Sequence, residues 1–453
     1  MSVKIEMNPQ RRRLFDIVVG WRRLQNEILI LNVALVLSLG SCLQAEDSVF
    51  SEPVFFTIGP GARAIASADF DNDGLIDLIT TSNTSGTYSV LLGNGDGTFQ
   101  SQIVNFVGGP TAVCTGDFNN DGIVDAAITN GGTDRVSILI GIGDGNFLPE
   151  VSFPTANSPI SVVVADFNAD GNSDLATSNI DTPDTVSVLL GNGDGTFGPT
   201  QSFATGNQTG GAAEALKSGD FNDDGFPDLV VVNTDSATVA ILLGAENGTT
   251  FELSGSYTVG LLPRDVAVAD FDADGMLDLA TASTFSFGVS VLLGTGDGSF
   301  SPAETYVTGA NPDSIVSVDF DGDGNTDIAT ANLGDGDVTV LFGLGDGSFQ
   351  APVPSSPIGE SPHSITAADF DADGLVDWAA TNSSSNQLAV FLNTSCNLVP
   401  GDVNQDGTVD LLDVEPFVTI LGEGVFQVEA DINQDGVVNL LDVQPFIDIL
   451  TGN

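Results

Sequence analysis

The chain has 453 residues and a formal net charge of −52, from 62 Asp+Glu against 10 Lys+Arg. After residue 45 there are 59 acidic and only 4 basic residues, so charge repulsion excludes nucleic acid and anionic lipid surfaces as partners. The acidic residues stand at fixed positions among Val, Ile, Leu and Phe, which excludes a disordered acidic tail.

Residues 1–45 are predicted to be a signal peptide. A basic segment ends at Arg23, and the apolar stretch that follows, Ile28–Leu39, is too short to span a bilayer. Two processing sites compete: Leu39–Cys42 resembles a bacterial lipobox, which would leave a lipid anchor on Cys42, and Leu43–Ala45 fits ordinary signal-peptidase cleavage. In both cases we expect an exported bacterial protein that is secreted or held at the cell surface.

A nine-residue motif, Asp-x-Asp/Asn-x-Asp-Gly-x-x-Asp, occurs seven times between residues 69 and 377. Successive copies begin 48 to 54 residues apart. A period of this length is typical of repeat architectures, in which each unit packs on its neighbours.

Each repeat is predicted to form four short strands. In the first repeat they cover residues 63–68, 76–81, 88–92 and 102–106, and the motif joins the first two. A glycine-rich turn, Gly93–Phe99, joins the third strand to the fourth, and its Asn-Gly and Asp-Gly pairs supply positive φ angles. Four strands repeated radially predict an all-β, seven-bladed β-propeller over residues 50–395.

The glycine-rich turn recurs in repeats two to six, at Gly141–Phe147, Gly191–Phe197, Gly244–Phe251, Gly294–Phe300 and Gly343–Phe349. Its terminal Phe is predicted to pack between neighbouring sheets, and its Asp (Asp96 in the first turn) to form the turn rather than bind metal. The seventh repeat ends at Leu388–Leu392 without this turn or a fourth strand. Because Ser51–Thr57 precedes the first motif where a fourth strand would lie, we expect it to close the ring on repeat seven.

The repeated motif predicts about seven Ca²⁺ sites, because alternate acidic oxygens on a tight glycine turn suit this ion. Positions 1, 3, 5 and 9 would bind through side chains and position 7 through its backbone carbonyl, while Gly at position 6 permits the reversal. Without metal these carboxylates repel one another, so we expect folding to be coupled to calcium binding. The predicted ligands in repeats one to four are Asp69, Asp71, Asp73, Leu75, Asp77, Asp117, Asn119, Asp121, Ile123, Asp125, Asp166, Asn168, Asp170, Asn172, Asp174, Asp220, Asn222, Asp224, Phe226 and Asp228. In repeats five to seven they are Asp270, Asp272, Asp274, Met276, Asp278, Asp319, Asp321, Asp323, Asn325, Asp327, Asp369, Asp371, Asp373, Leu375 and Asp377.

On these loops and glycine-rich turns, residues 50–395 resemble the FG-GAP/VCBS repeat family, whose best-known members are the propeller heads of integrin α subunits. The resemblance implies a calcium-stabilised propeller that serves adhesion, or contact with proteins or glycans, on extracellular surfaces. Asn at position 3 in repeats two to four (Asn119, Asn168 and Asn222) removes one charge from each site and predicts weaker binding there.

Residues 400–453 are predicted to form a second, α-helical calcium-binding domain. Two EF-hand-type loops of twelve residues each lead into an apolar helical segment, Val414–Leu421 and Val443–Leu450. Asp replaces the usual Glu at the twelfth position, and two Ca²⁺ ions are expected. The predicted ligands are Asp402, Asn404, Asp406, Thr408, Asp410, Asp413, Asp431, Asn433, Asp435, Val437, Asn439 and Asp442.

This tandem pair resembles a type I dockerin, a module that docks onto cohesin domains. The ligand spacing matches, but Leu411, Leu412, Leu440 and Leu441 stand where dockerins usually carry polar contact residues, and Pro416 and Pro445 fall early in the helices. Two interpretations therefore remain: a docking module for a cohesin-like or cell-surface partner, and a small calcium-stabilised cap or anchoring module.

No catalytic constellation is recognised, and we expect no enzymatic activity. His363, the only histidine, is predicted to lie at the surface or in a loop just before the first strand of repeat seven, and Trp378 and Cys114 are predicted to lie in the core. Three hypotheses follow: a secreted or surface-attached calcium-binding adhesion scaffold whose propeller face contacts a protein or glycan, a lectin-like propeller, and a dockerin-delivered polysaccharide-active enzyme. The aromatic candidates for glycan contact are Tyr88, Phe285, Phe287 and Tyr306.

Overall fold

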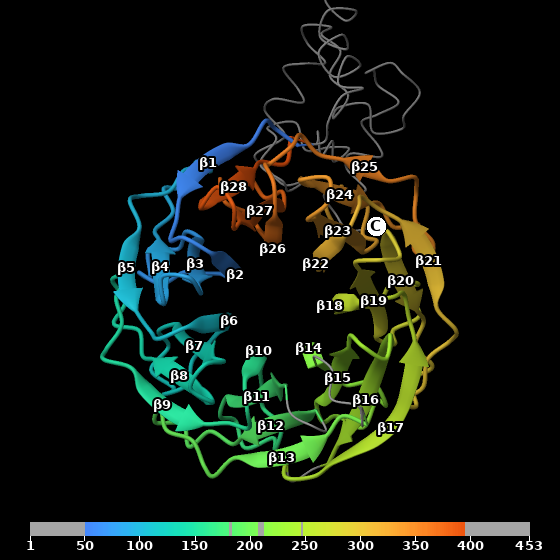
Figure 1. The fold of residues 1–453 in the computed structure, drawn as a ribbon, viewed down its shortest axis with the longest axis horizontal. Coiled ribbons are helices and arrows are strands. Elements are labelled where there is room, and N and C mark those ends of the chain that lie inside the picture. The colour runs from blue at the N-terminus through green and yellow to red at the C-terminus, as the bar shows by residue number, and fades with distance from the viewer. Residues whose placement is uncertain (1–49, 181–183, 207–212, 246–247, 395–453) are drawn as a thin grey trace, which may run out of the picture. The chain divides into compact units, whose positions relative to one another are not determined.

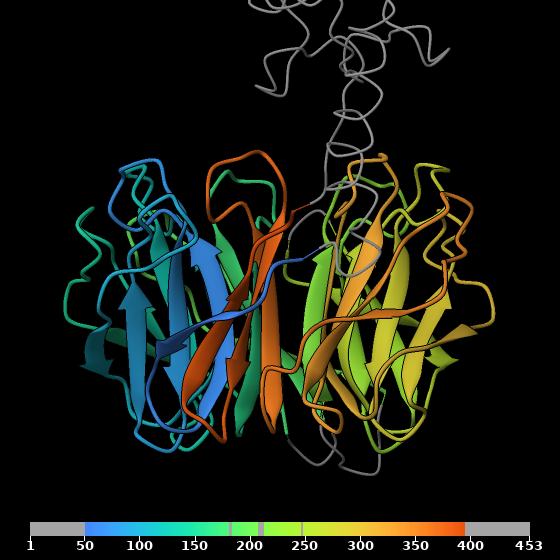
Figure 2. The same cartoon turned by 90° about the horizontal axis from the view of Figure 1, so that it is seen from above.

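The computed structural model describes residues 50–180, 184–206, 213–245 and 248–394. Their strands form seven antiparallel sheets of four strands each, which are arranged as blades around a common axis (Figure 1). Seen from the side, the strands run between two faces that are made of loops (Figure 2). The predicted all-β, seven-bladed propeller is confirmed. Within the described residues no helix is long and apolar enough to span a membrane.

Each blade has the same strand order from the axis outwards. The innermost strands are β2 (Ala62–Ala68), β6 (Pro110–Gly116), β10 (Pro159–Ala165), β14 (Ala213–Gly219), β18 (Pro263–Ala269), β22 (Pro312–Val318) and β26 (Pro362–Ala368). The second strands are β3 (Asp77–Ser82), β7 (Asp125–Asn130), β11 (Asp174–Asn179), β15 (Asp228–Asn233), β19 (Asp278–Ser283), β23 (Asp327–Asn332) and β27 (Asp377–Asn382). The third strands are β4 (Thr87–Leu91), β8 (Arg135–Leu139), β12 (Thr185–Leu189), β16 (Thr238–Gly244), β20 (Gly288–Leu292), β24 (Asp337–Leu341) and β28 (Gln387–Phe391). The outer strands are β5 (Ile103–Phe106), β9 (Val151–Pro154), β13 (Gln201–Ala204), β17 (Phe251–Thr258), β21 (Glu304–Val307), β25 (Val353–Pro354) and β1 (Val54–Thr57).

The ring is closed by the first strand of the described chain. Strand β1 pairs antiparallel with β28, with Val54 opposite Val390 and Thr57 opposite Gln387. Blade 7 is therefore built from both ends of the propeller sequence, in the order β1-β28-β27-β26. The predicted closure is confirmed, and it leaves every blade with four strands.

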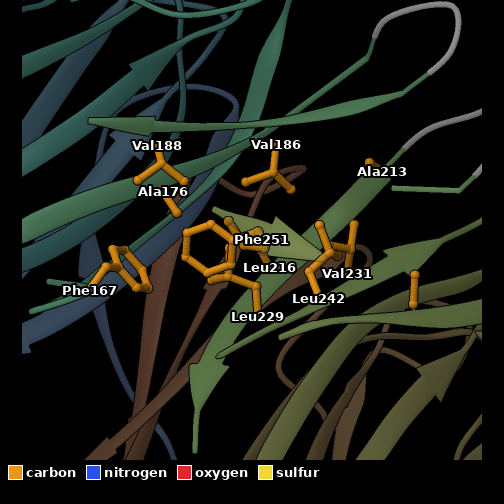
Figure 3. Close-up of a cluster of buried hydrophobic side chains, with 11 residues drawn as sticks. Phe167, Ala176, Val186, Val188, Ala213, Leu216, Leu229, Val231, Leu242 and Phe251 are labelled. Carbon is orange, nitrogen blue, oxygen red and sulfur yellow. The ribbon is translucent and has the colours of Figure 1, made fainter. Parts of the chain in front are cut away.

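The core lies between consecutive blades. Every residue of each second strand is buried, because that strand is covered by a neighbouring blade on both faces. Figure 3 shows one cluster, in which Phe167 and Val188 of blade 3 pack with Leu229 and Phe251 of blade 4. Short apolar strands are thus sufficient to build a hydrophobic core, because each blade buries both of its faces against neighbouring blades.

The turn Phe residues join the blades as predicted. Phe99 of blade 1 packs edge-to-face on Phe370 of blade 7 at 5.7 Å between ring centroids, and Phe147 of blade 2 packs in the same way on Phe70 of blade 1 at 5.8 Å. Trp378 is fully buried and stacks on Phe391 at 3.9 Å, so its predicted place in the core is confirmed. The predicted signal peptide, residues 1–45, and the predicted C-terminal domain, residues 400–453, lie outside the described residues.

Candidate metal centres

The seven acidic loops share one face of the propeller. Each loop joins the end of an innermost strand to the start of the second strand, and the antiparallel course of the blade brings the glycine-rich turn to the same face. The loops between blades and the hairpins between second and third strands lie on the opposite face. We call these the metal-loop face and the hairpin face.

Backbone amides shape each acidic loop. In blade 1 the N–H of Gly74 donates to Asp69 Oδ2 (2.9 Å) and the N–H of Leu75 donates to Asp73 Oδ1 (2.9 Å). Gly74 has a φ of 89°, and Asn72, at position 4, has a φ of 59°. The loop therefore reverses through two left-handed residues, of which sequence reasoning identified only the glycine.

Three carboxylates converge in four of the loops. One oxygen from each of positions 1, 3 and 9 lies within 4.8 Å of the other two in blades 1, 5, 6 and 7. The members are Asp69, Asp71 and Asp77; Asp270, Asp272 and Asp278; Asp319, Asp321 and Asp327; and Asp369, Asp371 and Asp377. In blade 7, Asp371 Oδ1 is buried with no hydrogen-bond partner. An orphaned carboxylate oxygen in an all-oxygen cluster fits a hard cation such as Ca²⁺.

Position 5 is placed differently from the other predicted side-chain ligands. Its carboxylate belongs to none of these convergent triads, and its Oδ1 accepts the N–H of position 7 in every blade at 2.8–2.9 Å. Sequence reasoning did not anticipate this loop-forming hydrogen bond. Binding of metal by position 5 and by the position-7 carbonyl stays a prediction.

The loops of blades 2 to 4 carry an internal hydrogen bond instead of a third carboxylate. Asn119 Nδ2 donates to Asp121 Oδ2 (2.8 Å), and Asn168 and Asn222 make the equivalent bonds at 3.0 Å. In blade 1 the corresponding pair is Asp71 and Asp73, and the pKa of Asp71 is raised by burial and by the charge of Asp73. In the Asn loops the side chains at positions 3 and 5 are joined by a hydrogen bond and do not repel each other in the absence of metal. In the Asp loops two carboxylates face each other at these positions, and their repulsion remains.

The ninth Asp links each loop to the glycine-rich turn of its blade. Asp77 is fully buried, and its Oδ2 and Oδ1 accept the N–H groups of Phe70 (2.8 Å) and Gly93 (2.7 Å). Burial raises the pKa of Asp77 to about 6, although these two hydrogen bonds lower it. Burial likewise raises the pKa values of Asp125, Asp174, Asp228 and Asp278 to about 6 and those of Asp327 and Asp377 to about 7.

These pKa values predict opposite pH dependences with and without metal. The ordinary pKa of 3.8 lies below the folded values of about 6 to 7, so between pH 4 and 7 the metal-free folded state binds more protons than the unfolded state. Its stability therefore falls as pH rises through this window. Thermal denaturation of calcium-stripped protein should give a higher Tm at pH 5 than at pH 7.5. In excess calcium the order should reverse, because the ion favours the ionised carboxylates; a calcium-free Tm that rises with pH would contradict this assignment.

Blade 7 has no glycine-rich turn, and two residues that sequence reasoning missed take the place of this turn beside the acidic loop. Asn393 takes the place of the first turn glycine: its backbone N–H donates to Asp377 Oδ1 (2.6 Å), as Gly93 donates to Asp77. Its Nδ2 donates to the carbonyl of Phe320 (2.6 Å), a position that accepts a turn N–H in other blades. Phe50 bridges to Asn393 and packs edge-to-face on Phe320 at 5.6 Å. The signal for Phe50 was its place directly before the closing strand.

Several predicted placements are corrected. His363 lies within β26 rather than in a loop before it; its side chain is partly exposed, and its Nδ1 is 2.6 Å from Asp313 Oδ2. Cys114 is partly buried: it packs against the core between blades 2 and 3, as predicted, and it also lines a cavity bounded by the innermost strands. Tyr88 is buried against Phe147, which removes it from the candidates for glycan contact.

The remaining candidates are placed as follows. Tyr306 packs on Phe349 at 5.1 Å, whereas Phe285 and Phe287 are exposed. Asp96 accepts hydrogen bonds from the N–H and hydroxyl of Thr98, which confirms that it forms the turn.

Seven blades, each with an acidic loop between its first two strands, define a seven-bladed β-propeller built from acidic-loop repeats. The FG-GAP-like repeat family matches residues 69–128, 117–177, 170–231, 220–281 and 319–380, and the chain belongs to this family. Residues 400–450 match the Dockerin type I domain. None of the curated proteins matches this chain.

Two solved structures share the fold. One is BBS1N, crystallised in complex with ARL6DN and soaked with lead: 12% identity, TM-score 0.54, covering 77% of this chain and 98% of that one. The other is a catalytically inactive virginiamycin B lyase from Staphylococcus aureus with quinupristin: 12% identity, TM-score 0.50, covering 75% of this chain and 99% of that one. At this identity the likeness concerns the fold alone.

The two families together describe a propeller joined to a docking module. Dockerin type I domains bind calcium and typically dock onto cohesin partners, and both families are typical of extracellular or cell-surface proteins. Acidic clusters are present in the propeller loops, and calcium binding by residues 400–450 stays a prediction.

Proposed function

We propose that the protein is an exported, calcium-binding interaction scaffold without catalytic activity. Its propeller, with seven Ca²⁺, presents the hairpin face to a protein partner, and its dockerin domain, with two Ca²⁺, anchors it to a cohesin-like or cell-surface partner. The observation that supports this most is the convergence of three carboxylates in the loops of blades 1, 5, 6 and 7. Those carboxylates are thereby assigned to metal rather than to acid–base chemistry.

An exposed apolar cluster on blade 5 makes the hairpin face a candidate surface for contact with a protein partner. Leu261 and Phe285 are each 62% exposed and Phe287 is 53% exposed. The N–H of Phe285 donates to the carbonyl of Leu261 (3.2 Å), and the N–H of Leu261 donates to Ser286 Oγ (2.6 Å), so the two loops are tied together. Large exposed apolar side chains held on ordered loops are typical of interaction sites.

The partner hypothesis is tested by changing this cluster in the full chain. We expect the double variant Phe285→Ser, Phe287→Ser to lose calcium-dependent capture of a partner from the cell-surface fraction, because it removes the apolar contact and leaves the core intact. Phe106→Ser is the matched control, since Phe106 is 83% exposed on the outer strand β5. Undiminished capture by the double variant would exclude the cluster as the contact.

A lectin-like propeller is the second candidate, favoured by the exposure of Phe285 and Phe287, since aromatic faces stack on sugars. A glycan array probed with the native chain and the double variant separates the two proposals. Glycan binding that the variant loses would support the lectin. A dockerin-delivered enzyme would require turnover of a polysaccharide, and observed turnover would overturn the non-catalytic proposal.

A further inference from the structure

The few basic side chains of the described chain gather at one place. Between residues 50 and 394 the described basic residues are Arg63, Arg135, Lys217, Arg264 and His363. All of these except Arg135 line one cavity of about 710 Å³ that is bounded by the innermost strands. In a region where acidic residues greatly outnumber basic ones, this distribution marks the cavity as chemically distinct.

One bulged residue from each innermost strand lines the cavity. Each innermost strand has a register irregularity at its second residue or directly after it, as between Pro263 and Asp265 in β18. An extra residue in a strand turns its side chain out of the regular alternation. The residues so placed all line the cavity, and they are Arg63, Thr111, Ile160, Glu214, Arg264, Asp313 and His363.

The carboxylates of the cavity already have partners. Arg264 Nη1 donates to Glu214 Oε1 (2.7 Å), and Asp313 Oδ2 lies 2.6 Å from His363 Nδ1. Asp265 Oδ2 accepts hydrogen bonds from Ser314 Oγ (2.9 Å) and the N–H of Ile315 (3.1 Å). Arg264 Nε is buried without a hydrogen-bond partner, 3.9 Å from Asp313.

Two cations are left without a carboxylate. Within the described residues neither Arg63 nor Lys217 forms a salt bridge. Lys217 is exposed, although it stands on an innermost strand, two residues before the end of β14. Cys114 holds the equivalent place in β6, and burial raises the pKa of its thiol to about 12, so it stays neutral and does not compensate the lysine.

We propose that this cavity binds a small hydroxylated carboxylate, a sugar acid or a similar hydroxy acid, with the unpaired cations Lys217 and Arg63 supplying the positive charge that attracts the carboxylate. Hydroxyl groups for the rest of such a ligand are present in the lining, including Ser67, Ser161 and Ser364, and the lining has no Phe, Tyr or Trp on which a neutral sugar would stack. The volume is that of an ordinary small-molecule site. Charge-assisted hydrogen bonds therefore supply the affinity. This site is independent of the metal loops and of the apolar cluster on blade 5.

The sequence provides a direct reporter, because Lys217 is the only lysine after Lys4. The native full chain, at a fixed free calcium concentration, is treated with an amine-acylating reagent, and the modification of each lysine is followed by peptide mass spectrometry. We expect millimolar D-glucuronate to slow acylation of Lys217 about tenfold and D-glucose to leave it unchanged.

Matched arginine variants make the test specific. Arg63→Gln should abolish the protection of Lys217 by glucuronate, whereas Arg135→Gln, which removes an exposed arginine outside the cavity, should preserve it. Equal melting temperatures of the two variants verify their folding. Unchanged acylation in glucuronate, protection that survives Arg63→Gln, or a Lys217 that does not react in the free protein would overturn the proposal. Equal protection by inorganic sulfate would overturn the assignment to a carboxylate.

Discussion

Removal of calcium is expected to lower the melting temperature of the full chain by on the order of 20 °C. Each occupied site adds about 2 kcal/mol to the free energy of unfolding when free calcium is well above an affinity of roughly 10⁻⁴–10⁻³ M. Seven propeller sites act on one closed ring, and each links the first two strands of its blade. Differential scanning calorimetry with and without EDTA measures the effect, with calcium content determined by elemental mass spectrometry. A melting temperature that EDTA does not change would refute the calcium assignment.

Two reciprocal substitutions separate metal binding from general destabilisation. Asp371→Asn gives blade 7 the loop chemistry of blades 2 to 4, in which Asn168 donates to Asp170. It should raise the Tm of the calcium-free protein, because it removes like-charge repulsion, and it should reduce the calcium-induced increase. Asn168→Asp should do the opposite. If both substitutions lowered the Tm in both conditions, the effect would be loss of packing rather than of ligand charge.

Substitution of Phe50 is expected to cause the second large loss of stability. Phe50 is only 5% exposed and packs edge-to-face on Phe320 and Trp378, at 5.6 and 5.9 Å between ring centroids. Phe50→Ala should lower the free energy of unfolding by about 3–5 kcal/mol, the usual effect of deleting a buried aromatic ring. The blade 7 junction would open first, because Phe50 is its only counterpart of the turn Phe found in other blades. Calorimetry and hydrogen exchange at residues 387–391 measure this.

Phe55 provides the matched control on the closing strand. It is 42% exposed, and its backbone pairs with Ala389. Phe55→Ala should change the free energy of unfolding by less than about 0.5 kcal/mol, since exposed positions tolerate truncation. If both variants lost the same stability, the closing strand would act through its backbone pairing alone, and the role assigned to the Phe50 ring would be wrong.

The fold was predictable from sequence because its determinants are local and repeated. Each Asp-rich loop and each Gly-x-Gly-Asp-Gly-x-Phe turn marks a strand end, and the missing turn of repeat seven indicated that Ser51–Thr57 supplies the last strand. The packing of Phe99 on Phe370 followed from the same repetition. Most of the fold prediction therefore came from the sequence repeat.

Features that break the repeat were not predictable in this way. Asn393 stands where other blades have a turn glycine, and its side chain donates a hydrogen bond to the Phe320 carbonyl across the junction. Arg264, Asp313 and His363 hold the same position in the innermost strands of consecutive blades, and the charge at this position varies from repeat to repeat, so the repeated pattern did not single out the cavity that they line. Tyr88 was mistaken for a surface aromatic because strand alternation does not show that the neighbouring blade covers it. Such long-range juxtapositions depend on the ring geometry rather than on local pattern.

The pairing of β1 with β28 also determines the order in which the propeller can assemble. A chain that emerges N-terminus first holds Val54–Thr57 without a partner until Gln387–Phe391 has been made. Before that moment the stacked blades form an open arc with two unpaired ends. Bringing these ends together costs loop-closure entropy, because the pairing of β1 with β28 joins residues far apart in the sequence. A polypeptide that stops before residue 387 remains such an arc. It also lacks the partner of β1, so Val54–Thr57 stays an unpaired edge strand that can pair with another chain and lead to aggregation.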